Sequence, residues 1–275
     1  MHSTASDGEY PPEEVMARAA RAGLAAVALT DHDTLDGVPA ALAAGSRLGL
    51  RVIGGCEFSV AVPWGEMHLL GYFLSPATPS IENFLANARE MRASRGQAMV
   101  ERLQALGIVI ELADLTLAAK GGAIGRPHVA RALVSRGAAT GLNDAFDRYL
   151  GRGKPAFVDK VLPPFAEVAQ LVHAVGGMVS AAHLKERGSR SVLRRLKEQG
   201  LDAVETRHPG HDPDLRARLT DHAIALGLLR TGGSDWHGDG GDDGVYAALG
   251  SQQVPGEWLD RLEQARPSVS VPEPM

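Results

Sequence analysis

Six short apolar segments of this chain contain or closely precede acidic or histidine side chains, and segments with helical periodicity lie between them. The apolar segments are residues 25–29, 51–56, 67–72, 177–182, 201–205 and 228–233. The helical segments are residues 11–22, 37–48, 164–175, 189–199, 212–226 and 255–265. Strands that alternate with helices form βα units, whose strands run parallel within one sheet. The pattern therefore predicts an α/β protein with a parallel sheet or barrel.

The placement of the polar residues favours a barrel. In a β/α barrel the active site gathers at the carboxyl ends of the strands. An open, doubly wound sheet would concentrate such residues at a single switch point instead. Because nearly every predicted strand leads into a His, Asp or Glu, we expect a barrel that is smaller or less regular than eight strands.

Residues 80–156 interrupt this alternation. Helical patterns over 81–106, 127–135 and 143–150 are separated by glycine-rich links, which predicts a helical insertion that covers the barrel as a substrate cap. The expected organisation is a first barrel part over 1–79, the insertion over 80–156 and a second barrel part over 157–265. The Pro- and Ser-rich residues 266–275 are expected to form a flexible tail.

Composition excludes several other classes of protein. The chain has 275 residues and a net charge of −5, so neither global disorder nor broad electrostatic binding of nucleic acid is expected. No stretch approaches the ~20 apolar residues of a membrane span, and the polar first ten residues do not resemble a signal peptide. The single cysteine, Cys56, fits a reducing cytoplasm. We expect a cytoplasmic protein with no membrane partner and no stable nucleic-acid complex.

Histidines and carboxylates gather at the predicted strand ends, and these are the ligands that Zn, Mn and Fe sites use. The candidates are His2, Asp7, His32, Glu57, His68, His183, Asp235 and His237. His173 and His222 lie inside predicted helices and are expected to be ordinary structural or surface residues. The candidate set is too large for one tetrahedral ion, and Glu57 could bridge two. A cluster of two or three ions suits phosphoester hydrolysis.

Four of these segments, residues 2–8, 29–34, 55–57 and 233–237, resemble the PHP (polymerase and histidinol phosphatase) family. Their order, together with Gly-Arg-Pro-His at 125–128, resembles the branch of 3′,5′-nucleoside bisphosphate phosphatases and 5′-to-3′ oligoribonucleotide nucleases. The resemblance implies a distorted, TIM-like (β/α)7 barrel. It also implies a trinuclear metal site, often manganese, with Zn or Fe as alternatives.

The resemblance further implies three ligand sets. One set is His2, Glu57 and Asp235; another is Glu57, His68 and His183; the third is Asp7, His32 and His237. It assigns catalytic roles to Glu57, Asp7, His32 and His237. The bridging role of Glu57 agrees with the interpretation from residue types.

One departure from the family pattern concerns the beginning of the chain. The family opens with a strand that ends in His-x-His, and His2 matches the second histidine, so the first histidine and its strand have no counterpart. A misplaced start or a truncated chain explains this better than a true loss. We expect His2 at the pocket with an open seam beside it, and an upstream strand ending in histidine in the natural chain.

Basic residues of the insertion are candidates for phosphate binding, because phosphates prefer arginine forks, lysines and helix N-termini. The expected substrate contacts are Arg95, Arg126, His128 and Lys154, together with His208 at a predicted strand end. For any one insertion residue, ordinary surface charge is an alternative of about equal weight. Arg126, His128 and Lys154 are favoured over that alternative because similar segments occur in the phosphatase branch that the chain resembles. His211 is expected to be exposed to solvent, and Cys56 is expected to be a packing residue rather than a nucleophile.

These features predict a metal-dependent phosphoesterase in which a metal-bound hydroxide attacks phosphorus in line. The expected substrates are the 3′-phosphate of 3′,5′-bisphosphonucleotides and the 5′ ends of short RNA. A histidinol-phosphate phosphatase is the alternative within the same class. A non-catalytic module that binds metal or nucleotide is the alternative from another class.

Overall fold

The structure is a computed structural model that describes residues 1–119, 125–239 and 248–267. Most of the expected tail, residues 268–275, lies outside the described residues. The chain divides into two compact units. Unit 1 comprises Met1–Glu82 and Leu162–Met275, and unit 2 comprises Asn83–Val161. Within the described part of the chain, no helix combines the length and apolarity needed to cross a membrane.

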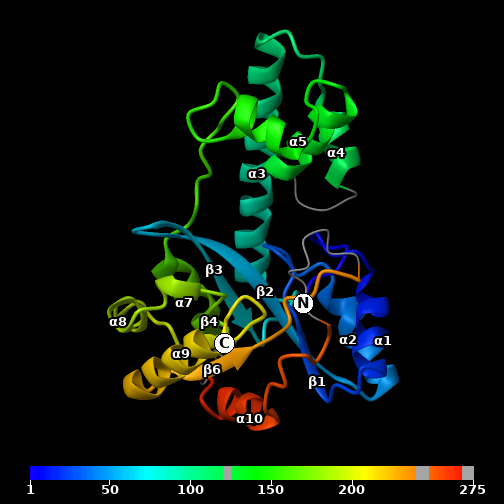
Figure 1. The fold of residues 1–275 in the computed structure, drawn as a ribbon. Coiled ribbons are helices and arrows are strands. Elements are labelled where there is room, and N and C mark those ends of the chain that lie inside the picture. The colour runs from blue at the N-terminus through cyan, green and yellow to red at the C-terminus, as the bar shows by residue number, and fades with distance from the viewer. Residues whose placement is uncertain (120–124, 240–247, 268–275) are drawn as a thin grey trace, which may run out of the picture. The chain divides into compact units, whose positions relative to one another are not determined.

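Unit 1 is built on a curled, mixed six-stranded sheet (Figure 1). In sheet order the strands are β1 (Ala26–Leu29), β2 (Arg51–Val62), β3 (Gly65–Tyr72), β4 (Met178–Ala181), β5 (Ala203–Arg207) and β6 (Leu229–Gly232). The pairs β1–β2, β4–β5 and β5–β6 are parallel, whereas β3 is antiparallel to both of its neighbours. The expectation of a wholly parallel sheet is therefore wrong for β3.

The physical reason is the length of the connection before β3. Only Pro63 and Trp64 separate β2 from β3, whereas a parallel crossover needs a dozen or more residues. Gly65 follows with φ +118°, a conformation that L side chains rarely adopt. The resulting hairpin pairs Ser59 with His68. His68 thus lies in the first half of β3, not at its end as predicted.

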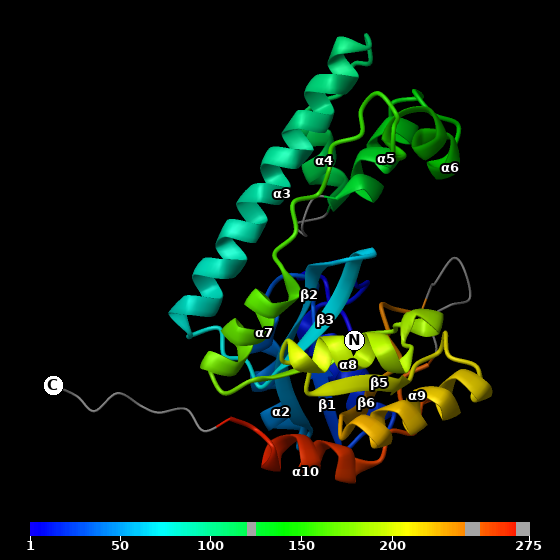
Figure 2. The same cartoon turned by 90° about the vertical axis from the view of Figure 1, so that its left-hand side faces the viewer.

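Helices cover the sheet close to where the sequence predicts them. They are α1 (Pro12–Arg21), α2 (Val38–Leu48), α7 (Phe165–Ala174), α8 (Arg190–Glu198), α9 (Pro213–Leu226) and α10 (Gly256–Gln264), with the short 3-10 turn η2 (Lys185–Arg187) before α8. Val15 and Met16 of α1 are buried in one apolar cluster with Leu29 of β1. Figure 2 shows α9 alongside β5 and β6, and α8 packs against α9.

Unit 2 is helical and has an apolar core of its own. Its elements are α3 (Pro79–Ala105, which begins in unit 1), α4 (Leu112–Ala119), α5 (Arg126–Ser135), α6 (Leu142–Ala145) and the π-helical turn η1 (Phe146–Leu150). Leu103 of α3, Leu115 of α4 and Leu133 of α5 are fully buried in this core. The sequence interpretation omitted α4 and assigned one helix where α6 and η1 follow each other.

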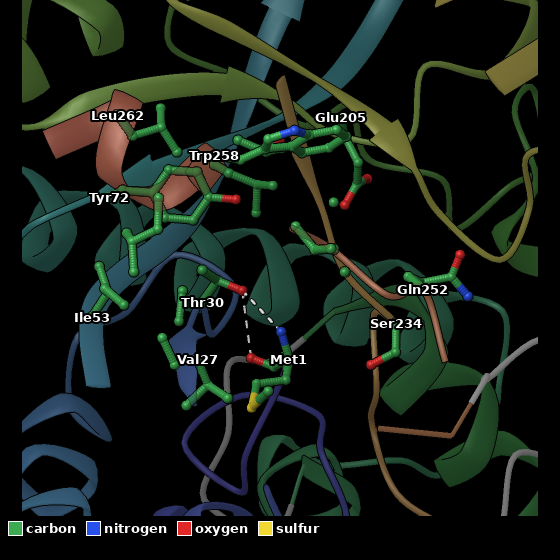
Figure 3. A pocket seen from close by; sticks show the side chains of 18 of the residues that line it. Met1, Val27, Thr30, Ile53, Tyr72, Glu205, Ser234, Gln252, Trp258 and Leu262 are labelled. Carbon is green, nitrogen blue, oxygen red and sulfur yellow. Dashed lines mark hydrogen bonds between the residues drawn. The ribbon is translucent and has the colours of Figure 1, made fainter. Parts of the chain in front are cut away.

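The sheet has an open seam between its first and last strands. In the described residues β1 pairs only with β2, and β6 only with β5. A cavity of about 350 Å³ lies between them, lined by Met1, Val27 and Thr30 on one side and Thr231 and Ser234 on the other (Figure 3). Backbone groups on the facing edges of two strands are therefore left without a ladder partner.

The His173–Asp202 pair gives a testable contribution to the stability of unit 1. The hydrogen bond that His173 donates to the carboxylate of Asp202 raises the pKa of His173, although partial burial opposes protonation. Because the folded pKa lies above the unfolded one, the stabilisation is complete below about pH 6.5 and is lost as pH rises through the folded pKa. His173→Ala should lower the free energy of unfolding by about 0.5–1 kcal/mol more at pH 5.5 than at pH 9. Urea unfolding at both pH values measures this, and an equal cost would contradict it.

Candidate metal centre

The eight predicted ligands converge within unit 1 at one edge of the sheet. His2 and Asp7 come from the loop before α1, and His32 follows β1. Glu57 and His68 lie within the hairpin strands β2 and β3, while His183 follows β4. The loop after β6 supplies Asp235 and His237. The antiparallel direction of β3 brings His68 to this edge, where the parallel strands end.

Glu57 is the common neighbour of the histidines. Its carboxylate is buried, with Oε1 lying 2.7 Å from His68 Nδ1 and 3.1 Å from His183 Nε2. The other oxygen, Oε2, lies 3.1 Å from His2 Nε2 and 3.9 Å from His32 Nδ1. Burial opposes ionisation of Glu57, but the hydrogen bonds from His183, His2 and His68 outweigh it and lower the pKa well below its ordinary value. Each carboxylate oxygen therefore faces its own pair of histidines.

Three groups of side chains have donor atoms close enough together to hold a cation. They are His2, Asp7, His32 and His237; His32, Glu57 and His68; and His2, Glu57 and Asp235. The third group is the same as one predicted ligand set, and the first contains another together with His2. The second differs from prediction because it includes His32 where His183 was expected. His183 nevertheless lies beside Glu57.

The geometry of the first group fits a bound cation. Asp7 Oδ1 lies 3.7 Å from His2 Nδ1 and 3.5 Å from His237 Nε2, and Asp7 Oδ2 lies 3.7 Å from His32 Nε2. Ligands at about 2.0–2.2 Å in a tetrahedral shell stand roughly 3.3–3.6 Å from one another. Buried His2 Nδ1 also has no hydrogen-bond partner among the described residues. These donor atoms are spaced for a shared ion rather than for direct hydrogen bonds.

The electrostatics of the centre point the same way. Burial opposes protonation of His2, but hydrogen bonds that its imidazole donates to the carboxylates of Asp235 and Glu57 raise its pKa to about 9. Burial also opposes ionisation of Asp235, yet the hydrogen bond that it accepts from His2 and the nearby side chain of His208 lower its pKa far below the ordinary value. By contrast, burial lowers the pKa of His32 to about 3. The carboxylates that hold a proton on His2 would equally hold a divalent cation, whose binding releases that proton.

Backbone strain is concentrated at the same place. His183 (φ 28°), Asp235 (φ 49°) and Asp33 (φ 48°) adopt positive φ without being glycine. Such conformations cost about 1–3 kcal/mol each and persist where the surrounding structure imposes them, often at functional sites. The loops that carry the candidate ligands are therefore held in their shape by tertiary contacts.

The known proteins that this chain resembles agree with the geometry. The sequence profile described as the PHP domain matches residues 1–218. The chain belongs to the PHP family. It is 33% identical to the 5′-3′ exoribonuclease Rnm of Salmonella typhimurium over 86% of this chain and 83% of that protein. It is 34% identical to the 3′,5′-nucleoside bisphosphate phosphatase of Chromobacterium violaceum over 88% of each chain.

A solved structure supports the assignment of the fold. A protein of Bifidobacterium adolescentis, provisionally described as a metal-dependent phosphoesterase, superimposes on this PHP chain with a TM-score of 0.80. The match covers 95% of this chain and 93% of the other, at 32% identity. The similarity of fold thus extends over most of both chains.

Two further side chains of the PHP unit lie at the centre. His208 is buried, with Nε2 lying 3.5 Å from Asp235 Oδ2, so the structure brings this predicted substrate contact to the ligands. Glu205 was missed, although it ends a predicted strand just as His183 follows one. It accepts a hydrogen bond from the backbone N–H of His183, and burial raises its pKa to about 7.

His211 is buried, so the expectation of an exposed side chain is wrong. The chain turns back after β5, where the backbone N–H of His211 donates to the carbonyl of His208. Its Nδ1 lies 3.4 Å from the Thr206 carbonyl, and burial lowers the pKa of its imidazole to about 4. The expectation for Cys56 agrees with its buried position.

The four remaining predicted substrate residues all belong to unit 2. Arg95 Nε donates to the carbonyl of Val158, and His128 Nδ1 accepts from the backbone N–H of Gly125 at the start of α5. The Arg126 guanidinium lies 5.6 Å from the ring centre of Phe157. Lys154 is exposed. Arg95 and His128 thus have contacts that stabilise unit 2 itself.

Replacing Glu57 tests the shared position of this carboxylate. Glu57→Gln keeps the size of the side chain but removes its charge. If Glu57 bridges two ions, both should be lost together, with affinities reduced beyond the ~10–100-fold that is typical of an outer partner. Metal analysis of purified protein measures this, with His173→Ala as the control that retains its ions. Full metal content in Glu57→Gln would refute the bridge.

Proposed function

We propose that this protein is a metal-dependent phosphoesterase. Its substrates are the 3′-phosphate of 3′,5′-bisphosphonucleotides and the 5′ ends of short RNA. The observation that carries the proposal is the buried Glu57 carboxylate at the junction of groups that can each hold a cation. Adjacent ions suit displacement at phosphorus, because they can stabilise the attacking and leaving oxygens together. The names of the two relatives, an exoribonuclease and a nucleoside bisphosphate phosphatase, describe activities of this kind.

The metal complement that we propose is three ions, manganese foremost, with Zn or Fe as alternatives. When bound, such ions lower the pKa of a water molecule and neutralise charge on the phosphate. Glu57, Asp7, His32 and His237 are the proposed catalytic residues. The contacts of Glu57 with three histidines prevent it from rotating away, so its two oxygens stay in fixed directions.

His208 is the proposed substrate contact within unit 1. Its Nδ1 accepts a hydrogen bond from the backbone N–H of Gly210, which leaves Nε2 to carry the proton and fixes the ring orientation. Nε2 is buried, points toward Asp235 and has no hydrogen-bond partner within the usual distance. It can therefore donate to a phosphate oxygen held beside Asp235.

Unit 2 is the proposed source of the groups that bind the second, non-reacting phosphate. Residues 83–161 contain 12 Lys and Arg against 7 Asp and Glu, whereas the rest of the chain contains 16 against 26. A positive unit in an acidic protein attracts a substrate that carries two phosphate groups. Arg126 and Lys154 are the foremost candidates. His128 supports the start of α5, which carries Arg126, and Arg95 donates to the carbonyl of Val158, four residues after Lys154. Because buried Cys56 is unpaired, we place the enzyme in the reducing cytoplasm.

Replacing the cations of unit 2 tests their role in binding the second phosphate. Arg126→Ala and Lys154→Ala should each raise KM for adenosine 3′,5′-bisphosphate by about 10-fold, the loss expected for one charge-assisted contact. KM for a simple aryl phosphate should change little, because that substrate has no second phosphate. Steady-state kinetics with both substrates measure this. Equal effects on both would indicate damage to the catalytic centre or the fold instead.

A substrate screen separates the proposed function from its alternatives. Metal-loaded protein is offered adenosine 3′,5′-bisphosphate, a short 5′-phosphorylated RNA and histidinol phosphate. Turnover of the first two over the third supports the proposal, and preference for histidinol phosphate supports the small-substrate alternative. Metal binding without turnover of any phosphoester would indicate a non-catalytic module.

We propose also that the complete barrel has a seventh strand in the seam between β1 and β6. The backbone at Met1 and His2 already lies across this gap. Thr30 N–H donates to the Met1 carbonyl, and His2 N–H donates to the Trp236 carbonyl. An extended segment that enters the seam ahead of Met1 would continue these bonds and fill the apolar cavity beside Val27.

Restoring such a strand tests the proposed completion of the barrel. A segment of the form apolar-Asp-Leu-His placed before Met1 should raise the melting temperature by several degrees. The physical reason is that it pairs two exposed strand edges and buries apolar surface. It should also increase metal content, because it adds a histidine beside His2. Calorimetry and metal analysis of both chains measure this, and equal stability and ion content would contradict the proposal.

A further inference from the structure

Two buried aspartates on either side of His32 point into different ligand-bearing segments. Asp31 and Asp33 are 2% and 6% exposed, and neither belongs to a group that can hold a cation. A buried carboxylate is costly unless hydrogen-bond donors satisfy it. The hydrogen-bond donors around each aspartate therefore identify the segment that each one holds in place.

Asp31 is bonded to the loop that carries His2 and Asp7. Its Oδ1 accepts hydrogen bonds from the backbone N–H of Ser3 at 2.6 Å and from Ser6 Oγ at 2.7 Å. Its Oδ2 accepts from Ser3 Oγ at 2.7 Å. Residues 2–7 contain no helix or strand, so regular secondary structure does not set their shape. Through Ser3 and Ser6, the carboxylate of Asp31 thus connects both ends of the loop to the segment that carries His32.

Asp33 is bonded to the strand that carries Glu57. Its carboxylate accepts hydrogen bonds from the backbone N–H and the hydroxyl of Ser59, at 2.8 and 3.1 Å. Two backbone bonds flank this contact, from Asp33 N–H to the Glu57 carbonyl and from Glu57 N–H to the Asp31 carbonyl. Asp33 has φ 48°, so this turn persists because its partners impose it.

We propose that Asp31 and Asp33 are positioning residues with separate targets in the metal centre. Asp31 sets the positions of His2 and Asp7, and Asp33 sets the position of His32 relative to Glu57. The inference rests on the metal centre of the proposed function but not on the identity of the substrate. Each aspartate therefore controls a different group of ligands. The group of His32, Glu57 and His68 contains no residue of the loop held by Asp31.

Titration of metal-free protein with Mn²⁺ tests this division. Asp31→Asn turns an amide N–H₂ toward one of the donors from Ser3 and Ser6, so it should weaken the ions that use His2 and Asp7 by about 10–100-fold. The ion held by His32, Glu57 and His68 should keep its affinity. Asp33→Asn should instead weaken the two ions that use His32, and the ion held by His2, Glu57 and Asp235 should keep its affinity. Uniform weakening of all ions, or none, in both variants would overturn the proposal.

Asp202→Asn is the matched control for a purely structural effect. Asp202 also accepts a backbone N–H, from Val179, and a side-chain bond, from His173, but it holds no ligand-bearing loop. It should lower the melting temperature and leave every Mn²⁺ affinity unchanged. If Asp31→Asn does not fold, the double variant Ser3→Ala/Ser6→Ala removes two of the three donors and keeps the charge. The same selective loss is expected there, and unchanged affinities would overturn the proposal.

The Mn²⁺ titration is independent of turnover. Selective loss of ions in Asp31→Asn together with a failed substrate screen would reject the proposed function and leave the positioning roles intact. Normal turnover of adenosine 3′,5′-bisphosphate by the parent protein, with no selective loss in any variant, would reject the positioning roles alone.

Discussion

The buried charge of Glu57 is the constraint on which the rest of unit 1 depends. An ionised carboxylate taken out of water is strongly destabilising unless cationic or hydrogen-bonding groups surround it. Here the compensating groups are His2, His68 and His183, which come from three segments distant in sequence. Because both oxygens of Glu57 are engaged, the loop before α1, the β2–β3 hairpin and the loop after β4 must meet at one point.

The direction of β3 decides how that meeting is achieved. In a wholly parallel sheet a residue early in a strand would lie at the edge opposite the active site. The two-residue connection after β2 forces β3 to return antiparallel, and the start of β3 then lies beside the carboxyl ends of the other strands. His68 can therefore reach Glu57 from within a strand. Alternating apolar residues identify a strand but do not state its direction.

Hydrogen bonds to buried carboxylates then hold the loops between these strands. Asp31 and Asp33 fasten the loop of residues 2–7 and the turn after β1, and Glu205 accepts the backbone N–H of His183. All three carboxylates accept hydrogen bonds from segments that carry candidate ligands. Positive φ at Asp33 and His183 shows that local preference alone would not give these loops their shape. Rigid strands place the centre, and buried carboxylates shape the loops that complete it.

The sequence by itself determined the order of strands and helices in unit 1, the eight candidate ligands and the family. These follow from local signals, because apolar periodicity reports which face of an element is buried, and the His and carboxylate motifs are contiguous. Only the tertiary structure decided the antiparallel course of β3, the burial of His211 and the closeness of His32 to Glu57 and His68. It also revealed Glu205 and the separate targets of Asp31 and Asp33. Each of these features depends on which segments meet in space. A pattern of residue types along the chain does not specify the distances between residues that are far apart in sequence.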